Sequence, residues 1–465
     1  MPDNPMLPDG FLAMLADTGS PLFDGLGDTL LSTAPQVAVR VNPAKGAALP
    51  AGADRVEWSP DGFYLVGRPG FTFDPALHQG LYYVQDASSM AVTQAVAEAV
   101  RACGGRPLRY LDACAAPGGK TLGALGCLPA GSFVVANEYS RRRVDVLTEN
   151  LVKWGAGHTV VTSCDASSIR GLDGFFDIIG ADVPCSGEGM MRKEPEAVAQ
   201  WSPGLVAECA SLQRSIVACL WRMLRPGGWL VYSTCTFNLD ENERVVDYLV
   251  SEFAAETVAV PALDNAAGVA GGIGTSARCY RFVPGRVRGE GQFVALLRKP
   301  GDGPAATPRV RGRRSAAKSS LSPICAGWVD GGFELWTDGD SVRALPAAHR
   351  GLAGAVGESM HIVSGGLEVA AVKGRDLVPS QALAMSTALC RDAFACAEVD
   401  AATALRYLER NAVVLPEGTP RGYVLLTCGG SPLGFVKNLG NRSNNLYPAS
   451  WRILSPGRAP VSVLR

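Results

Sequence analysis

Two of the thirteen cysteines in this chain occupy positions where a thiolate could act on a bound molecule. Cys185 follows a predicted strand at residues 176–181, and Cys235 ends the next predicted strand, at residues 229–235. The carboxyl ends of neighbouring parallel strands open into one crevice, so we expect the two thiols to lie close together. Cysteine is a strong nucleophile near neutral pH, and the pair therefore favours covalent chemistry on a substrate. Taken singly, a cysteine at a strand end is more often a packing residue.

A glycine-rich turn earlier in the chain predicts a cradle for a ligand. Residues 108–121, LRYLDACAAPGGKT, run from a buried strand into a turn and then a helix. Gly118 and Gly119 let the backbone approach a ligand closely, and Pro117 stiffens the turn. Backbone amides at the start of a helix suit a nucleotide-sized ligand, although an ordinary strand-to-helix turn would carry the same residues.

Acidic residues stand at the ends of the three strands that follow this turn: Glu138, Asp165 and Asp182. Glu138 is placed to accept hydrogen bonds from ribose hydroxyls, and Asp165 to accept one from an adenine amino group. Any one of them could be a solvated loop carboxylate. Three in register with one glycine turn predict a nucleoside site.

The elements that must position these residues alternate between strand and helix, which predicts an α/β fold with a mostly parallel sheet. Helices are expected at 86–102, 140–153, 204–224 and 240–253. A Gly-rich turn between the last two strands predicts an antiparallel hairpin. The seven predicted strands are 108–113, 133–138, 158–164, 176–181, 229–235, 278–283 and 292–298. Such a sheet resembles the class I S-adenosylmethionine-dependent methyltransferase fold, a Rossmann-like seven-stranded sheet.

The chain is too long for one ordinary core, and composition divides it into five segments. We expect a small α+β extension at 1–75, the catalytic domain at 76–300, a basic linker at 301–322, an α+β connecting domain at 323–400 and a β module at 401–465. Short strands are predicted within 328–337, 341–346 and 361–365, followed by a helix around 379–397.

Bulk properties limit the possible partners. The net charge of −1 gives no overall attraction to a polyanion, but residues 401–465 hold eight basic residues against two acidic ones. An RNA contact is therefore expected in the carboxy-terminal third. No C-x-x-C pair occurs, which predicts neither a disulfide framework nor a metal site. The sequence begins without a basic, apolar secretory signal and has no apolar run of membrane-spanning length, so we expect a cytoplasmic protein without a membrane partner.

Four sequence blocks, taken in order, resemble the RNA cytosine-C5 methyltransferase family: DACAAPGGK, ANEYS, DVPCSGEGM and YSTCTF. The resemblance spans roughly residues 80–300, and a TC-T cysteine after a PC-S-G cysteine distinguishes the RNA enzymes from the DNA ones. It implies S-adenosyl-L-methionine as cofactor. The positions that it assigns to the cofactor crevice are Cys114, Ala115, Ala116, Pro117, Gly118, Gly119, Lys120, Glu138, Asp165 and Asp182.

The resemblance also gives the two cysteines different roles. Cytosine C5 takes a methyl group only after a nucleophile has added at C6. The family implies that Cys235 makes this addition and that Cys185 assists release of the product, while Asp182 also holds the edge of the base. A cytosine inside an RNA stem would have to be flipped out. Val183 stands where the family usually has alanine, and we expect only local repacking there.

Motifs near the two ends of the chain indicate which RNA is the substrate. The segments 379–384, 430–437 and 444–452 are similar to the PUA-like end of RsmF-type enzymes, which implies small-subunit (16S) ribosomal RNA as the substrate. A tRNA enzyme with the same catalytic residues is the nearest alternative, and a catalytically inactive RNA-binding relative is another. Arg40, in an amino-terminal family block with 85–90, is expected either to touch RNA backbone or to pair with a carboxylate.

Overall fold

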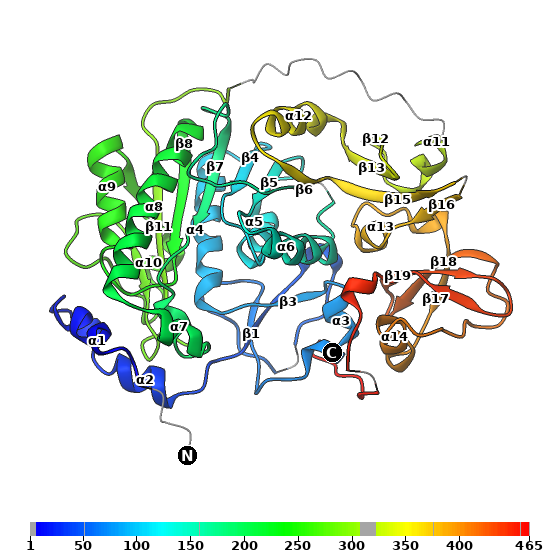
Figure 1. Cartoon of the computed structure of the whole chain (residues 1–465), viewed down its shortest axis with the longest axis horizontal. Helices are drawn as coiled ribbons and strands as arrows, with labels where there is room; N and C mark the ends of the chain where they lie inside the picture. The colour runs from blue at the N-terminus through cyan, green and yellow to red at the C-terminus, as the bar shows by residue number, and fades with distance from the viewer. Residues whose placement is uncertain are drawn as a thin grey trace.

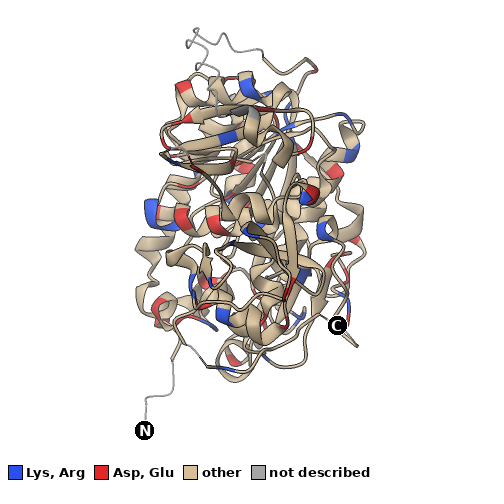
Figure 2. Cartoon of the chain, turned by 90° about the vertical axis from the view of Figure 1, so that its right-hand side faces the viewer, with Lys and Arg blue, Asp and Glu red and all other residues tan. Residues whose placement is uncertain are grey.

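The computed structural model describes residues 6–50, 52–157, 159–306, 322–374, 376–455 and 457–464 (Figure 1). Most of the predicted basic linker, 307–321, lies outside the described residues. Among the described helices, none is long and apolar enough to cross a membrane. Lys and Arg are interspersed with Asp and Glu on the side of the molecule that Figure 2 shows, so neither sign of charge dominates it.

A sheet in the order β10-β11-β8-β7-β4-β5-β6-β14 forms the centre of the molecule, with β9 paired to β11. The strands from β4 to β8 are parallel, and β10 and β11 form the predicted antiparallel hairpin. The seven predicted strands are β4 (Arg109–Asp112), β5 (Phe133–Asn137), β6 (Thr159–Thr162), β7 (Phe176–Asp182), β8 (Leu224–Thr234), β10 (Tyr280–Phe282) and β11 (Gln292–Arg298). The described sheet also contains β9 (Glu256–Val258) and β14 (Ile362–Gly365). The α/β methyltransferase fold is confirmed, with two more strands than expected.

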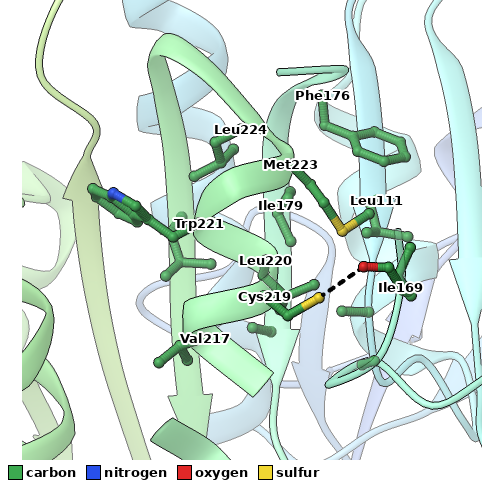
Figure 3. Packing of buried hydrophobic residues seen from close by; sticks show 14 of the residues in the cluster. Leu111, Ile169, Phe176, Ile179, Val217, Cys219, Leu220, Trp221, Met223 and Leu224 are labelled. Carbon is green, nitrogen blue, oxygen red and sulfur yellow. Dashed lines mark hydrogen bonds between the residues drawn. The ribbon is translucent and has the colours of Figure 1, made fainter. Parts of the chain in front are cut away.

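Helices cover both faces of the parallel strands, which are buried along almost their whole length, as expected for a sheet covered on both sides (Figure 1). Leu220 and Met223 of one helix pack against Leu111 and Ile179 of the sheet, and the Cys219 thiol donates a hydrogen bond of 3.3 Å to the carbonyl oxygen of Ile169 (Figure 3). The helices are α4 (Val92–Ala102), α5 (Gly119–Cys127), α6 (Arg141–Trp154), α7 (Pro195–Gln200), α8 (Pro203–Met223), α9 (Glu243–Phe253) and α10 (Pro261–Asp264).

The amino-terminal part has its own three-stranded sheet, in the order β2-β1-β3. Its third strand lies beyond residue 75, where the sequence analysis ended the extension. The elements are α1 (Asp9–Ala16), α2 (Leu26–Ser32), β1 (Ala38–Val41), β2 (Gly62–Tyr64), α3 (Pro75–His78) and β3 (Tyr82–Val84). The end of the chain returns to this region, because the backbone amide of Val461 donates to the carbonyl of Phe73 at 2.9 Å (Figure 1).

Two four-stranded sheets make up most of the carboxy-terminal part, in the orders β12-β13-β15-β16 and β17-β18-β19-β20. Their elements are α11 (Ser322–Cys325), β12 (Phe333–Asp338), β13 (Ser341–Pro346), α12 (Arg350–Ser359), β15 (Leu367–Lys373), β16 (Asp376–Pro379), α13 (Gln381–Met385), β17 (Ala395–Glu398), α14 (Ala401–Leu408), β18 (Gly422–Cys428), β19 (Ser431–Asn438) and β20 (Ser443–Asn445). The second sheet crosses residue 400, because β17 pairs with β18.

The predicted helix around 379–397 is wrong beyond its first turns. Within 379–397 the only α-helix is α13, and the last residues of this segment belong to the strand β17. Along β17 the side chains of Cys396 and Glu398 are exposed while Ala397 is buried, the alternation of a strand with one covered face. The predicted strand at 361–365 exists as β14, but it joins the edge of the catalytic sheet at β6 rather than the neighbouring carboxy-terminal sheet.

Candidate functional site

The glycine-rich turn after β4 lies at the carboxyl edge of the sheet and leads into α5, as predicted. Gly118 has a φ of 117°, a backbone conformation that residues other than glycine rarely adopt. A Cβ on Gly119 would lie 3.0 Å from the Tyr83 ring and 3.2 Å from the Gln85 amide. The two glycines therefore do different work: the first makes the turn, and the second lets β3 approach the start of α5.

A cavity of about 170 Å³ opens beside this turn. Seven of the ten predicted cofactor positions line it, whereas Gly118, Glu138 and Asp165 do not. The rest of the wall comes from β3 and the segment that follows it, and sequence reasoning assigned none of these residues to the cofactor. The predicted lining residues are Cys114, Ala115, Ala116, Pro117, Gly119, Lys120 and Asp182, and those missed are Tyr83, Val84, Gln85, Asp86 and Ser89.

Glu138 and Asp165 follow the ends of β5 and β6. Each carboxylate accepts hydrogen bonds from nearby residues but has acceptor sites left over. Glu138 accepts a 2.9 Å hydrogen bond from the amide of Ser140, and its second oxygen lies 3.6 Å from Arg143. Asp165 uses Oδ1 to accept from the amide and hydroxyl of Ser167, at 2.9 and 2.7 Å. Each carboxylate keeps acceptor capacity for a ligand's hydroxyl or amino groups.

Asn137, which sequence reasoning missed, ties the three strand ends together. Its amide nitrogen donates to the carbonyl oxygens of Ala113 and Cys164, at 3.0 and 2.9 Å. Its oxygen accepts from the hydroxyl of Thr162 at 3.0 Å. These bonds connect the loops after β4 and β6 across β5, so the rim of the crevice is fixed before any ligand arrives.

Lys120 and Asp182 join the cofactor turn to the cysteine strands. The Lys120 ammonium lies 2.8 Å from Asp182 Oδ2, and the hydroxyl of Ser233 donates to Asp182 Oδ1, also at 2.8 Å. Burial acts to lower the pKa of Lys120, but the neighbouring Asp182 raises it above its ordinary value, with a smaller contribution from Cys235. A cation is therefore held between the cavity and the thiols.

The structure brings the two predicted cysteines together. Cys185 Sγ and Cys235 Sγ lie 3.3 Å apart, and both side chains are partly buried. The hydrogen bond to Cys235, together with burial, raises the pKa of the Cys185 thiol well above its ordinary value. Either sulfur can donate the proton of this contact, so the two thiols share one hydrogen-bonded site.

Hydrogen bonds to two buried glutamates connect the loops that carry the cysteines. Glu188 accepts hydrogen bonds from the amides of Phe237 and Asn238, at 2.6 and 3.0 Å, and from the indole of Trp201 at 3.0 Å. Glu241 accepts from the amide of Ser186 at 3.0 Å, and burial raises the pKa of its carboxyl. Sequence reasoning placed Glu241 in the first turn of a helix, but α9 begins two residues later.

Gly189 gives the cysteine loops a further contact. Its amide donates to the carbonyl of Cys235 at 2.7 Å, and a Cβ on Gly189 would lie 2.5 Å from that oxygen. The loop after β7 therefore contacts the segment after β8 through the backbone as well as through the Glu188 side chain.

Arg40 fulfils neither of its two predicted roles. The residue is 2% exposed, and its guanidinium donates to Gln85 Oε1 and Thr93 Oγ1, both at 2.9 Å. It packs beside Gly123 of α5. Arg40 is thus a buried brace between the amino-terminal sheet, the cavity wall and two helices. Both predicted roles assumed that the guanidinium is exposed or paired with a carboxylate, and nothing local in the sequence indicates that it is buried against Gln85 and Thr93.

Among the described residues, no group of three or more His, Cys, Asp or Glu side chains is arranged to hold a metal ion. Three of the residues missed at the site share one signal. Gln85, Asp86 and Glu188 are polar or acidic residues inside the recognised blocks, where neighbouring positions are small or apolar. A polar residue in such a context is costly to bury without a partner, so it marks a bonded position.

Comparison with known proteins places this arrangement in a family. The model described as 16S rRNA methyltransferase RsmB/F matches residues 107–298. Models of the RsmF amino-terminal domain and the RsmF PUA domain match residues 7–87 and 394–453.

Two relatives are named ribosomal RNA small subunit methyltransferase F. The one from Klebsiella pneumoniae is 32% identical over 412 residues, covering 84% of this chain and 83% of the relative. The one from Erwinia tasmaniensis is 30% identical over 465 residues, covering 95% and 94%. NSun6 from Pyrococcus horikoshii shares the fold, with a TM-score of 0.53 at 20% identity over 64% of this chain and all of that structure.

Proposed function

The chain belongs to the family of ribosomal RNA small subunit methyltransferase F, and we propose that it transfers the methyl group of S-adenosylmethionine to C5 of a cytosine in 16S ribosomal RNA. The single observation that carries the chemistry is the 3.3 Å contact between Cys185 and Cys235. Methylation at C5 needs one group to add at C6 and a means of reversing that addition. Two thiols in contact beside a nucleoside cavity supply both.

In this mechanism Cys235 is the nucleophile. Its thiolate forms a bond to C6 of the flipped cytosine, and the electron pair of the C5–C6 double bond moves to C5. S-adenosylmethionine, when bound, supplies an electrophilic methyl group. After transfer, C5 gives up its proton to water, the electron pair of that C–H bond re-forms the C5–C6 double bond, and the C6–S bond breaks with its electron pair returning to the sulfur of Cys235 as a thiolate. Cys185, whose sulfur lies 3.3 Å from that of Cys235, assists this elimination by donating a hydrogen bond to the leaving sulfur.

The chain's own residues suit the cofactor. The backbone and small side chains of Cys114, Ala115, Ala116, Pro117, Gly118 and Gly119 would hold it, and Glu138 and Asp165 retain acceptor capacity for hydroxyl and amino groups. Asp182, already held by Lys120 and Ser233, would face both the cofactor and the target base.

We further propose the division of the chain into an amino-terminal extension (1–75), a catalytic domain (76–300), a basic linker (301–322), a connecting domain (323–400) and a PUA-like module (401–465). The pairing of β3 with β1 supports moving the first boundary toward residue 85, and that of β17 with β18 supports moving the last toward residue 394. The proposed substrate places the enzyme in the cytoplasm.

The experiment that tests the function has two arms. Purified protein with methyl-labelled S-adenosylmethionine is offered 16S rRNA, assembled small subunits or tRNA, and bisulfite sequencing compares total RNA from cells with and without the gene. A 5-methylcytosine that disappears from 16S rRNA on deletion is the expected result. A loss confined to tRNA, or no loss in either RNA, would overturn the proposed substrate.

A further inference from the structure

A basic segment lies directly beside the cofactor turn and has no part in the chemistry above. After β5 the chain passes through Tyr139, whose side chain is 74% exposed, into Arg141, Arg142 and Arg143 at the start of α6. All three arginines are exposed. The segment therefore presents three guanidinium groups and one aromatic ring at the rim of the crevice.

This segment is anchored to the cofactor turn. Arg143 donates a 2.6 Å hydrogen bond to the carbonyl of Ala116, and farther along α6 Asn150 donates to the carbonyl of Pro117 at 2.8 Å. Glu138 fixes the turn itself by accepting from the amide of Ser140. The first turn of α6 thus keeps one position relative to the cavity, and whatever binds there lies near the cofactor.

Arg141 and Arg142 differ from Arg143 because no hydrogen bond or ion pair connects their side chains to another residue within the described parts of the chain. Their position is also electrostatically unfavourable. The first turn of α6 contains no acidic residue, and a helix start carries positive partial charge, so the helix end repels each of these cations. Asp145, exposed on the same helix, is the one acidic residue within four positions of them along α6.

We propose that Arg141 and Arg142 bind backbone phosphates of the RNA strand that brings the target cytosine to Cys235, with Tyr139 available to stack on a neighbouring base. This inference rests on the proposed function. A phosphate offsets the charge of both arginines and the positive end of the helix at once. Guanidinium groups suit phosphate through paired, parallel hydrogen bonds, and an exposed aromatic ring accepts any base.

The test measures RNA binding by the full chain with a short cytidine-containing oligoribonucleotide, by fluorescence anisotropy at several salt concentrations. In Arg141→Ala/Arg142→Ala, the loss of two phosphate contacts should weaken binding about tenfold and reduce the slope of log affinity against log salt by about 1.4. Arg141→Lys/Arg142→Lys keeps both charges and should retain the slope. Arg101→Ala/Arg278→Ala removes two exposed arginines elsewhere and should leave affinity and slope unchanged.

Calorimetry with S-adenosylmethionine separates this role from damage to the cofactor turn. The alanine pair should bind the cofactor like the wild type. Unchanged RNA affinity and slope in that variant would overturn the inference, and so would a parallel loss of cofactor affinity. Failure of the wild type to methylate cytosine would overturn the proposed function instead, since the binding measurement does not depend on turnover.

Discussion

On the cofactor side of the crevice, the loop after β4 is shaped by backbone and small residues, and Gly119 allows Tyr83 and Gln85 to close the cavity wall. On the cysteine side, the loops after β7 and β8 are held by carboxylates that accept several hydrogen bonds each, as Glu188 and Glu241 do. The geometry of the first side depends on small volumes, as at Gly119. The other tolerates neither loss of an acceptor nor loss of a thiol, because its geometry depends on individual side-chain atoms.

The largest effect on activity is expected on the cysteine side. Cys235→Ala removes the group that forms the bond to C6, and methylation should fall by at least about 10⁴-fold. Cofactor affinity, measured by calorimetry, should persist because the cavity is built by the other side. Cys396→Ala, at an exposed cysteine of β17, serves as the control and should remain active. Full activity of the Cys235 variant would disprove its role as nucleophile.

Cys185→Ala should stop turnover at a later point. Addition to C6 and methyl transfer proceed, but elimination is slow, so a covalent complex of protein and RNA should accumulate. It would migrate as a slow band on a denaturing gel and disappear after digestion with ribonuclease. Normal turnover without such a band would contradict a role in release.

Glu188→Gln tests the hydrogen bonds that hold the cysteine loops. Within the described residues every hydrogen-bond partner of this carboxylate is a donor, so an amide group in its place leaves at least one donor facing another. We expect the free energy of unfolding in urea to fall by about 2–3 kcal/mol, with a matching loss of kcat. Glu252→Gln, at an exposed position of α9, should change neither quantity. Equal stability of the two variants would show that the network is dispensable.

A smaller effect is expected on the cofactor side. In Gly119→Ala the new methyl group pushes on Tyr83 and Gln85, and the Kd for S-adenosylmethionine should rise about three- to tenfold, a cost of roughly 1 kcal/mol. Gly126→Ala is the matched control in the same helix, because no atom lies within 4 Å of its added Cβ. Similar cofactor affinities in the two variants would contradict the close approach of β3.

The smallest effect on activity is expected from Asp112→Asn. This variant tests whether the carboxyl of Asp112, buried beside the cofactor turn, has a raised pKa. Burial raises the pKa of Asp112 from 3.8 to about 6, opposed by a hydrogen bond from Thr121. Between these two pH values the folded state binds more protons than the unfolded state, so the wild type loses stability as pH rises. Relative to the variant, its free energy of unfolding should decline from pH 4 to pH 6 and then level off. A constant difference would show that Asp112 titrates normally.

The same contrast explains how much could be predicted from the sequence. The parallel strands and the glycine turn were predictable because buried strands are continuously apolar and tight turns need glycine. The cysteine pair followed from strand order, since Cys185 and Cys235 end neighbouring strands. Their roles came only from family resemblance.

What could not be predicted depends on contacts between distant parts of the chain. Arg40 reads as a surface cation until its partners Gln85 and Thr93 are known. Glu241 resembles a residue that opens a helix, but its carboxylate faces Ser186. The strand at 361–365 was visible as a strand, yet nothing local indicates that it pairs with β6, about 200 positions earlier.

That pairing has a consequence for how the protein is made. β6 would be the open edge of the catalytic sheet if β14 did not cover it, and an open edge invites pairing with other chains. During synthesis the segment through β11 emerges first, so the edge stays unprotected until residue 365 has left the ribosome. Shortened versions of the chain that stop after the catalytic residues would keep that exposure permanently, and we expect them to aggregate even though every group needed for chemistry is present.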